Sequence, residues 1–176
     1  MSQIGLFYSS STGNTEKVAD MIKDAFDKYQ DGLVTIHHVT DGPLTDMLAY
    51  DKIILGIPTW DIGELEPDWD DAFSQMDDLD LSGKQVAVYG LGDQEGYPDS
   101  YQDGVGILAK KSREKGAELV GYTSTDGHEY DYSAGEEDGK FMGLCLDEDQ
   151  QPELTPERVD AWVKQLVGEF KLELPT

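Results

Sequence analysis

The chain has 176 residues, of which 38% are hydrophobic, and its 37 acidic against 13 basic residues give a formal net charge of −24. This length and apolar content suffice for one packed core, so we expect a single domain over residues 1–176 and exclude an intrinsically disordered chain. The negative charge argues against nucleic acid and against anionic membrane surfaces as partners, because both are bound through basic side chains.

Cysteine content and hydropathy predict a cytoplasmic protein. The single cysteine, Cys145, excludes an internal disulfide and points to a reducing compartment. No apolar stretch is long enough to span a bilayer, and no basic flank precedes the short first apolar run, as a signal sequence would require. We therefore expect a cytoplasmic monomer.

The first half of the chain predicts three strands separated by helices. The strands are expected at short apolar runs of the sequence, residues 4–8, 33–39 and 52–57. Apolar residues recur at helical spacing from Val18 to Tyr29 and give that helix one apolar face. Pro58 is expected to end the third strand, and another helix is expected from about Asp68.

The second half continues the alternation but contains one interruption. Residues 85–92 predict the fourth strand, and a helix follows from Asp103 to about Lys115, before Gly116. The fifth strand is expected at two apolar runs, residues 117–122 and 143–147. Between these runs lies an excursion rich in glycine and acidic residues, about 123–143, which we interpret as an insertion into the fifth strand.

The last helix opens at Thr155, which can cap it, and Pro156 fits its first turn. Its apolar stripe is expected to face the core: Val159, Trp162, Val163, Leu166, Val167 and Phe170. Strands and helices thus alternate along the whole chain. The fold class predicted is α/β, with a doubly wound parallel sheet covered by helices on both faces.

The first candidate site is the loop after the first strand, "SSSTGNT" (9–15). It offers hydroxyl groups and an amide, and Gly13 lets backbone N–H groups approach a ligand closely. A helix N-terminus adds unpaired N–H groups and a partial positive charge, so this loop can bind a phosphate without any lysine or arginine. The lysine of a nucleotide-hydrolysing P-loop is missing, and "GLGDQEG" (90–96) does not fit the dinucleotide motif G-x-G-x-x-G.

Two further loops follow the third and fourth strands, and each carries an aromatic residue, Trp60 or Tyr97. In open sheets of this kind, ligands bind outside the carboxyl ends of the strands, where the strand order reverses. Two aromatic rings beside a phosphate site suggest that a planar group lies between them. FMN is a planar cofactor with one terminal phosphate, so the pattern points to FMN.

Taken together, these motifs resemble those of the flavodoxin family in its long-chain form. "SSTGNT" is similar to the family's T/S-x-T-G-x-T phosphate loop, and "PTWDIGEL" and "GLGDQEGYPDSYQD" resemble its tryptophan and tyrosine loops. The excursion at 123–143 and "GLCLDED" resemble the insertion of the long-chain subgroup. The resemblance covers essentially the whole chain and implies a five-stranded sheet of order 2-1-3-4-5.

The resemblance also implies which residues bind FMN. The set is Ser10, Ser11, Thr12, Gly13, Asn14, Thr15, Pro58, Thr59, Trp60, Asp61, Ile62, Gly63, Leu91, Gly92, Asp93, Tyr97, Ser100, Tyr101, Gln102 and Asp149. Residues 10–15 should hold the phosphate, and Trp60 and Tyr97 should cover the two faces of the ring, with Tyr97 the more nearly parallel.

Other positions of this set should surround the edges of the flavin. The backbone of 61–63 should meet the reactive edge, where a peptide reorients on reduction. Gly92, Asp93, Ser100 and Gln102 should line the polar edge, and Asp149 should reach the ribityl chain. Asp61 departs from the asparagine or glycine more frequent in the family, and a carboxylate at that position should alter the potential.

The function implied is that of a low-potential one-electron carrier, which shuttles between semiquinone and hydroquinone and is not an enzyme. Acidic surroundings should disfavour the anionic hydroquinone and make it a strong reductant. Between Glu66 and Asp80 lie seven acidic residues and no basic one. We expect this run to dock basic-surfaced redox proteins such as a ferredoxin/flavodoxin–NADP reductase.

Two alternatives are considered. An FMN-dependent NAD(P)H:quinone oxidoreductase of the same fold would need cationic contacts for its nicotinamide cofactor, and the three loops contain few basic residues. A response-regulator receiver would need carboxylates after the first and third strands. This chain has Ser9–Ser10 and Pro58–Thr59–Trp60 there, which excludes a receiver.

The remaining polar candidates do not suggest a metal or redox site. His37 and His38 are adjacent on a predicted strand and should point to opposite faces, so they should not share a metal. His128 has no companion histidine within the excursion. Cys145 lies in an apolar run and is expected to be a small buried residue.

Overall fold

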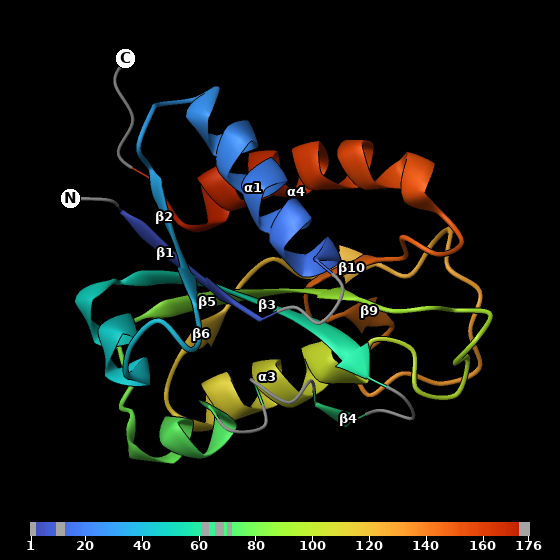
Figure 1. Cartoon of the computed structure of the whole chain (residues 1–176), viewed down its shortest axis with the longest axis horizontal. Helices are drawn as coiled ribbons and strands as arrows, with labels where there is room; N and C mark the ends of the chain where they lie inside the picture. Colours follow the sequence, from blue (N-terminus) through green and yellow to red (C-terminus); the bar gives the residue numbers. More distant parts are fainter. Residues whose placement is uncertain (1–2, 10–12, 61–63, 66–68, 70–71, 173–176) are drawn as a thin grey trace.

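The structure is a computed structural model of the chain. It describes residues 3–9, 13–60, 64–65, 69 and 72–172, with the backbone alone at 59–60 and 64–65. A mostly parallel sheet forms the middle of three layers, and helices pack on both of its faces (Figure 1). Helices α1 (Asn14–Asp27) and α4 (Thr155–Glu169) cover one face, and α3 (Asp103–Glu114) covers the other. The predicted fold class is confirmed.

The order of the strands in the sheet is β2–β1–β3–β5–β10, and every pair along this path is parallel. The strands are β1 (Ile4–Tyr8), β2 (Val34–His38), β3 (Lys52–Trp60), β5 (Gln85–Leu91) and β10 (Leu144–Leu146). A two-residue strand, β4 (Glu64–Leu65), pairs antiparallel with the end of β3. This is the predicted order 2-1-3-4-5, with β2 at one edge.

The fifth strand is split by the insertion, as predicted. Its first part, β6 (Glu118–Leu119), pairs with the start of β5, and its second part, β10, pairs with the end of β5. The intervening segment forms a separate three-stranded antiparallel sheet of β7 (Thr123–Ser124), β8 (Glu136–Glu137) and β9 (Lys140–Phe141). Phe141 is buried in the core on the α3 side, so the insertion packs against the main fold.

Alternation along each strand divides the core into two clusters, one on each face of the sheet. Tyr8 lies in the cluster beneath α1 and α4, whereas its neighbour Phe7 lies in the cluster beneath α3. The histidines of β2 follow the same rule. The ring of His37 stacks on Phe7 with centroids 4.7 Å apart, and that of His38 contacts Tyr8 edge-on. Their predicted opposite orientation is confirmed.

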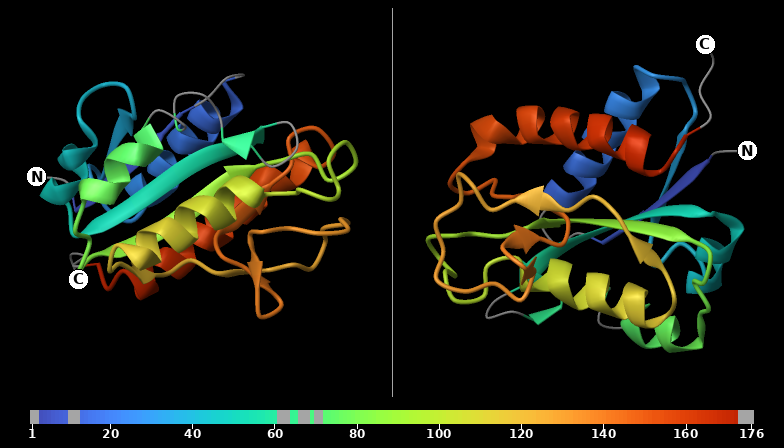
Figure 2. Two further views of the ribbon diagram at one scale, coloured as in Figure 1. Left: turned by 90° about the horizontal axis from the view of Figure 1, so that it is seen from below. Right: turned by 180° about the vertical axis from the view of Figure 1, so that it is seen from behind.

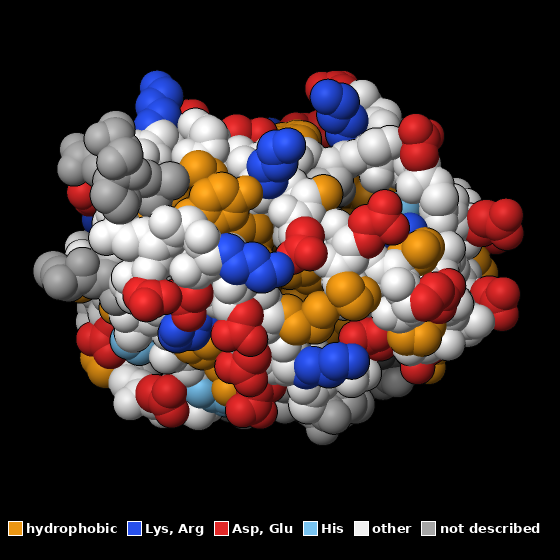
Figure 3. All heavy atoms as spheres, turned by 90° about the horizontal axis from the view of Figure 1, so that it is seen from above, with side chains coloured by type: hydrophobic (Ala, Val, Ile, Leu, Met, Phe, Trp, Pro, Cys, Tyr) orange, Lys and Arg blue, Asp and Glu red, His pale blue; other side chains and the backbone are white. Residues whose placement is uncertain are grey.

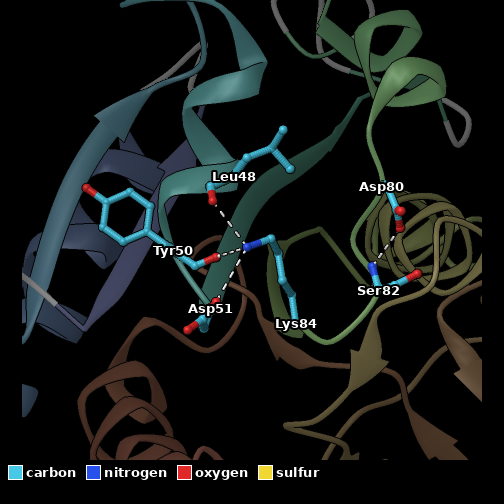
Figure 4. Close-up of polar contacts among 6 residues, drawn as sticks. All are labelled: Leu48, Tyr50, Asp51, Asp80, Ser82 and Lys84. Carbon is cyan, nitrogen blue, oxygen red and sulfur yellow. Dashed lines mark hydrogen bonds and ion pairs between the residues drawn. The ribbon is translucent and has the colours of Figure 1, made fainter.

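Short 3-10 helices complete the fold: η1 (Leu44–Ala49), η2 (Ser74–Asp78) and η3 (Pro152–Leu154). Lys84 fixes the end of η1 against the start of β3 (Figure 4). Its ammonium group donates to the carbonyl oxygens of Leu48 at 3.2 Å and Tyr50 at 2.7 Å, and it lies 3.6 Å from the Asp51 carboxylate. One partly buried lysine side chain thus satisfies backbone acceptors at the amino edge of the sheet.

Three local predictions are wrong. Pro58 does not end the third strand but pairs with Leu91 inside it, because extended backbone suits proline and costs only one N–H donor. Tyr29 lies beyond the end of α1 and is 42% exposed rather than part of its buried face. Thr155 is the first residue of α4 rather than its cap, because η3 leads directly into the helix.

In the part of the chain that the structure describes, the helices are too short or too polar to cross a bilayer. Cys145 is buried in the α3-side core, as predicted, and burial raises the pKa of its thiol well above the usual value.

Candidate functional site

The candidate site lies at the edge of the sheet where β1, β3 and β5 end. These three strands are parallel neighbours, so the segments after Tyr8, Trp60 and Leu91 leave the sheet at the same edge. The strand order reverses between β1 and β3, which is the switch point where ligands bind in open α/β sheets. The flavodoxin-like sheet is one of the folds on which this rule is based, so the rule adds no independent support here.

The amino end of α1 supplies backbone donors at this edge. Gly13 precedes the helix with φ +87°, a left-handed conformation that glycine adopts without strain. Glycine has no side chain with which to cap the first turn, and α1 starts at Asn14 immediately after it. The first-turn N–H groups and the positive end of the helix dipole are suited to an anion. Ser10, Ser11 and Thr12 lie outside the described residues.

Tyr89 fixes the first turn of α1 to the sheet. Its ring is fully buried on β5, and its hydroxyl donates to the Thr15 carbonyl oxygen at 2.9 Å. Burial raises the pKa of Tyr89 well above its usual value, so the hydroxyl stays a donor. The ring lies over Gly56 of β3, where any Cβ would overlap it. Gly56 is therefore required for this contact.

Gly56→Ala is expected to lower the free energy of unfolding by about 1–3 kcal/mol, because the added methyl group displaces the Tyr89 ring. Gly168→Ala, on α4, is the matched control, because a Cβ there meets no atom within 4 Å. It should stabilise the helix by about 0.5–1 kcal/mol. Urea unfolding of both variants measures the difference. Equal effects would show that the ring does not need the space above Gly56.

A buried tryptophan holds the backbone of β3 near the site. Trp69 is fully buried on the α3 side, and its indole N–H donates to the Gly56 carbonyl oxygen at 2.8 Å. It lies in the acidic segment that follows the tryptophan loop. The sequence interpretation missed this role, although a buried indole N–H requires an acceptor and could have suggested it.

The loop after β5 is shaped by Asp93. One oxygen of its carboxylate accepts the backbone N–H groups of Glu95 at 3.1 Å and Gly96 at 2.8 Å, and the side-chain amide of Gln150 at 3.0 Å. Burial alone would raise the pKa of Asp93, but these hydrogen bonds outweigh it and lower the pKa. The Tyr97 N–H donates to the Asp93 carbonyl oxygen, and the Tyr97 side chain remains 42% exposed. The loop thus presents an aromatic ring at the surface.

Asp147 joins this loop to the turn after β10. It is fully buried, and one of its carboxylate oxygens accepts the Gln94 N–H at 3.0 Å. The other oxygen accepts the N–H groups of Asp149 at 3.0 Å and Gln150 at 2.9 Å. The sequence interpretation chose Asp149 and missed Asp147. Its position directly after a buried strand could have suggested its role, because a buried carboxylate requires hydrogen-bond donors around it.

Carboxylates are close together around Asp149. The pKa of Asp149 is raised, first by burial and then by the negative charges of Asp93, Asp147 and Glu148. Glu148 is paired with Lys17 of α1 at 3.1 Å. The field at this side of the site therefore opposes additional negative charge. Figure 3 shows that, by contrast, the face over α1 and α4 carries basic side chains among the acidic ones.

Residues 100–102 are placed by backbone and core contacts. Ser100 and Tyr101 are buried, and Gln102 has a left-handed conformation at φ +60° before α3. The side-chain amide nitrogen of Gln102 donates to the Leu146 carbonyl oxygen at 2.7 Å. The side-chain oxygen of Gln102, Oε1, is buried without a partner among the described residues. A Cβ at Gly92 would meet this amide at 3.2 Å, so the glycine leaves room for it.

Comparison with known proteins identifies the family. The sequence model described as Flavodoxin matches residues 6–162. The chain belongs to the flavodoxin family. It is 48% identical to a flavodoxin of Nostoc sp. over 97% of this chain and 98% of that one, and 42% identical to flavodoxin 1 of Escherichia coli over 98% and 97%. The recognition of a flavodoxin from the sequence motifs is confirmed, and the insertion fits the long-chain type.

Solved flavodoxin structures agree with the fold. The Fusobacterium nucleatum flavodoxin bound to flavin mononucleotide superimposes with a TM-score of 0.89 at 34% identity, covering 96% of this chain and 99% of that chain. The flavodoxin fold therefore extends over nearly the whole length. Among the described residues expected to bind a cofactor, hydrogen bonds hold the loop after β5, with Asp93, beside the turn after β10, with Asp149. β1 and β3 end at the same edge of the sheet as β5.

Some expected positions of the flavodoxin site lie outside this description. Asp61, Ile62 and Gly63 are not among the described residues, and at Thr59 and Trp60 only the backbone is described. The backbone of both residues lies in β3 and pairs with β4. The ring contacts expected of Trp60 stay a prediction.

Proposed function

We propose that the chain carries single electrons on a non-covalently bound FMN at low potential and acts as a carrier rather than an enzyme. The observation that carries this proposal is its family membership over nearly the whole chain, together with the FMN-bound Fusobacterium nucleatum relative of the same fold. The main sheet and its covering helices extend from β1 to α4, and the small sheet of the insertion packs against them, which supports one functional domain over residues 1–176.

The phosphate is held by the segment from residue 10 to 15. This assignment is supported by the left-handed Gly13, by the start of α1 at Asn14, and by the hydrogen bond from Tyr89 that fixes Thr15. No lysine or arginine lies between residues 9 and 15, so backbone N–H groups and hydroxyls supply the donors. Neutral donors and the helix dipole bind a dianion without cancelling the negative field around it.

The ring lies between Trp60 and Tyr97. The partial exposure of Tyr97, on a loop that Asp93 holds in shape, supports its part in this assignment. Pro58, Thr59 and 61–63 approach the ring from the β3 side, and Leu91, Gly92 and Asp93 from the β5 side. Because the side chains of 100–102 are buried, this segment contributes backbone groups. Asp149 contacts the ribityl chain.

Bound FMN supplies one-electron redox chemistry, and the chain sets the potential at which this chemistry occurs. The same carboxylates that raise the pKa of Asp149 oppose further negative charge nearby. A reduced cofactor that gains negative charge is therefore destabilised, and its potential falls. Each 1.4 kcal/mol of such repulsion corresponds to about 59 mV for a one-electron couple.

Asp61→Asn is expected to raise the lower of the two one-electron potentials of bound FMN. Removing one carboxylate beside the flavin relieves about 1–2 kcal/mol of repulsion, or about 40–90 mV. Asp24→Asn is the control, because this exposed aspartate lies ten residues along α1 from Asn14, about 15 Å away. Potentiometric titration measures both variants. An unchanged or lower potential in Asp61→Asn would contradict the assignment.

The acidic run from Glu66 to Asp80 docks basic-surfaced redox proteins. Part of its charge is already paired within the fold, because Lys111 of α3 forms an ion pair with Asp77. Lys115 lies beside the same residue and donates to the Asp77 backbone carbonyl oxygen. The remaining carboxylates act over distances limited by salt screening. Electron-transfer rates with a basic reductase should fall about tenfold or more between low and physiological ionic strength. Salt-independent rates would exclude this docking surface.

A titration of the FMN-free chain with FMN tests the proposed function. Flavin fluorescence should be quenched at a one-to-one ratio, because aromatic rings stack on the flavin. The purified loaded chain should not consume NADPH without a reductase, whereas the quinone oxidoreductase alternative requires such consumption. Unquenched FMN would reject the cofactor, and NADPH consumption would favour the enzyme. A cytoplasmic location stays a prediction.

A further inference from the structure

A cavity lies between α4 and the start of the insertion. Its volume is about 200 Å³. Its α4 wall consists of residues 158, 161, 162 and 165, which share one helix face by their spacing. Its opposite wall is the segment from Thr123 to His128, and β10 lies at its base. Figure 2 (right) shows this segment passing beneath α4.

Hydrogen bonds between these walls hold the cavity in shape. The Trp162 indole donates to the Gly121 carbonyl oxygen at 2.9 Å, and the Gln165 amide donates to the Tyr122 carbonyl oxygen at 2.8 Å. The Thr123 hydroxyl donates to the Gly143 carbonyl oxygen at 2.6 Å. These three lining donors are therefore already satisfied within the protein.

Arg158 differs from these three donors in its hydrogen bonding. Its Nη1 is buried and has no hydrogen-bond partner among the described residues, and its Nη2 contacts only the Gly127 carbonyl oxygen, at 3.5 Å. In a chain of net charge −24, a guanidinium that forms no described ion pair is unexpected. A buried cationic donor without an acceptor is costly, so a bound acceptor stabilises it.

Arg158 carries the only positive charge among the described residues that line the cavity. His128 donates to or accepts from the Tyr101 hydroxyl through Nδ1 at 2.8 Å. Burial, followed by the positive charge of Arg158, lowers the pKa of His128 to about 4, so its ring is neutral near pH 7. Asp126 is the one acidic lining residue. Its presence allows a monoanion beside Arg158 but disfavours a dianion.

The lining also defines the size and polarity of the ligand. Leu144 and Trp162 provide an apolar wall, and the Ser124 hydroxyl accepts the Asp126 N–H while keeping its own hydrogen to donate. At about 30 Å³ for each water-sized group, the cavity of about 200 Å³ holds roughly six to seven such groups. A carboxylate with a chain of three or four carbons has this size, and a carboxylate matches the planar fork of a guanidinium.

We propose that this cavity binds a small aliphatic monocarboxylate, with Arg158 as its charge partner and Ser124 as a second donor. The bound anion would link α4 to the insertion and stabilise their contact. This site is separate from the phosphate-binding segment after β1, and the proposal does not depend on FMN binding.

Butyrate titration of the purified, FMN-saturated chain tests the proposal by NMR, through the indole N–H signal of Trp162. Saturation in the low millimolar range is expected, with a rise in the melting temperature at saturating butyrate. Arg158→Gln should raise the dissociation constant at least tenfold. Arg113→Gln is the matched control, because the chain's other arginine is exposed and paired with Glu137 at 2.8 Å. It should change the constant less than twofold.

Two further probes are used at matched ionic strength. Butyramide, which is uncharged, tests whether charge matters, and sulfate tests whether the site prefers a carboxylate. Butyramide binding as tightly as butyrate would overturn the role of charge, and sulfate binding as tightly would overturn the carboxylate assignment. No saturable shift with any probe would mean that the cavity holds water alone, which also overturns the proposal. If Arg158→Gln does not fold, Ala161→Leu provides the second test, because it adds bulk to the α4 wall and should abolish the butyrate shift.

Discussion

Asp147→Ala is expected to lower the free energy of unfolding by about 3 kcal/mol and to loosen two segments of the proposed FMN site at once. The substitution removes the acceptor for three backbone N–H groups, those of Gln94, Asp149 and Gln150. Each buried donor left without an acceptor costs about 1–3 kcal/mol, and the loss of a buried carboxylate's own desolvation cost offsets part of the total.

Urea unfolding of the FMN-free chain measures this effect, with two comparison variants. Asp131→Ala makes the same chemical change at an exposed position and should stay within about 0.5 kcal/mol of the parent. Asp147→Asn keeps one acceptor oxygen, so its free energy of unfolding should lie between those of Asp147→Ala and Asp131→Ala. If Asp147→Ala and Asp131→Ala are equally stable, the three hydrogen bonds do not hold the loop.

Tyr97→Ala is expected to weaken FMN binding by about 10- to 100-fold. An aromatic ring stacked on a flavin contributes its buried apolar area and about 0.5–1.5 kcal/mol of stacking beyond it. The loop itself should survive, because Asp93 shapes it through its carboxylate and through its backbone carbonyl oxygen, which accepts the Tyr97 N–H. The loss should therefore appear in affinity and not in the stability of the FMN-free chain.

The control for this prediction is Tyr29→Ala. Tyr29 and Tyr97 are both 42% exposed, but Tyr29 follows the far end of α1. Fluorescence titration with FMN should give a Tyr29→Ala dissociation constant within twofold of the parent. If the parent, Tyr97→Ala and Tyr29→Ala bind FMN with equal affinity, Tyr97 does not contact the flavin.

Much of this fold could be predicted from the sequence because its elements are strongly patterned. The apolar runs of β1, β3 and β5 are buried on both sides, and the apolar stripe of α4 is buried at Val159, Trp162 and Leu166. The split fifth strand was also predictable, since glycine and acid interrupt an apolar run that later resumes. The candidate loops were found by their place after these strands.

What could not be predicted depends on contacts between distant segments. The role of Asp147 requires the loop after β5 to lie beside the turn after β10, a separation of 53 residues for its bond to Gln94. The bond from Trp69 to Gly56 likewise depends on how the chain returns to β3. Thr155 has the composition of a cap, but η3 precedes α4 without a break, which no local signal indicated.

The clustering of acidic side chains at the site also depends on contacts between distant segments. The sequence shows 37 acidic residues but not which of them, far apart along the chain, lie close together in space. The structure places Asp93, Asp147 and Glu148 around Asp149, closely enough to raise its pKa. It also pairs Asp77 with Lys111, so one member of the predicted docking run is partly neutralised.

The absorption spectrum of the FMN-loaded chain during stepwise reduction tests the central claim most directly. The one-electron-reduced flavin should accumulate as a distinct species over a wide range of applied potential, and full reduction should require a much lower potential than free FMN does. A direct two-electron conversion at the potential of free FMN would contradict the account.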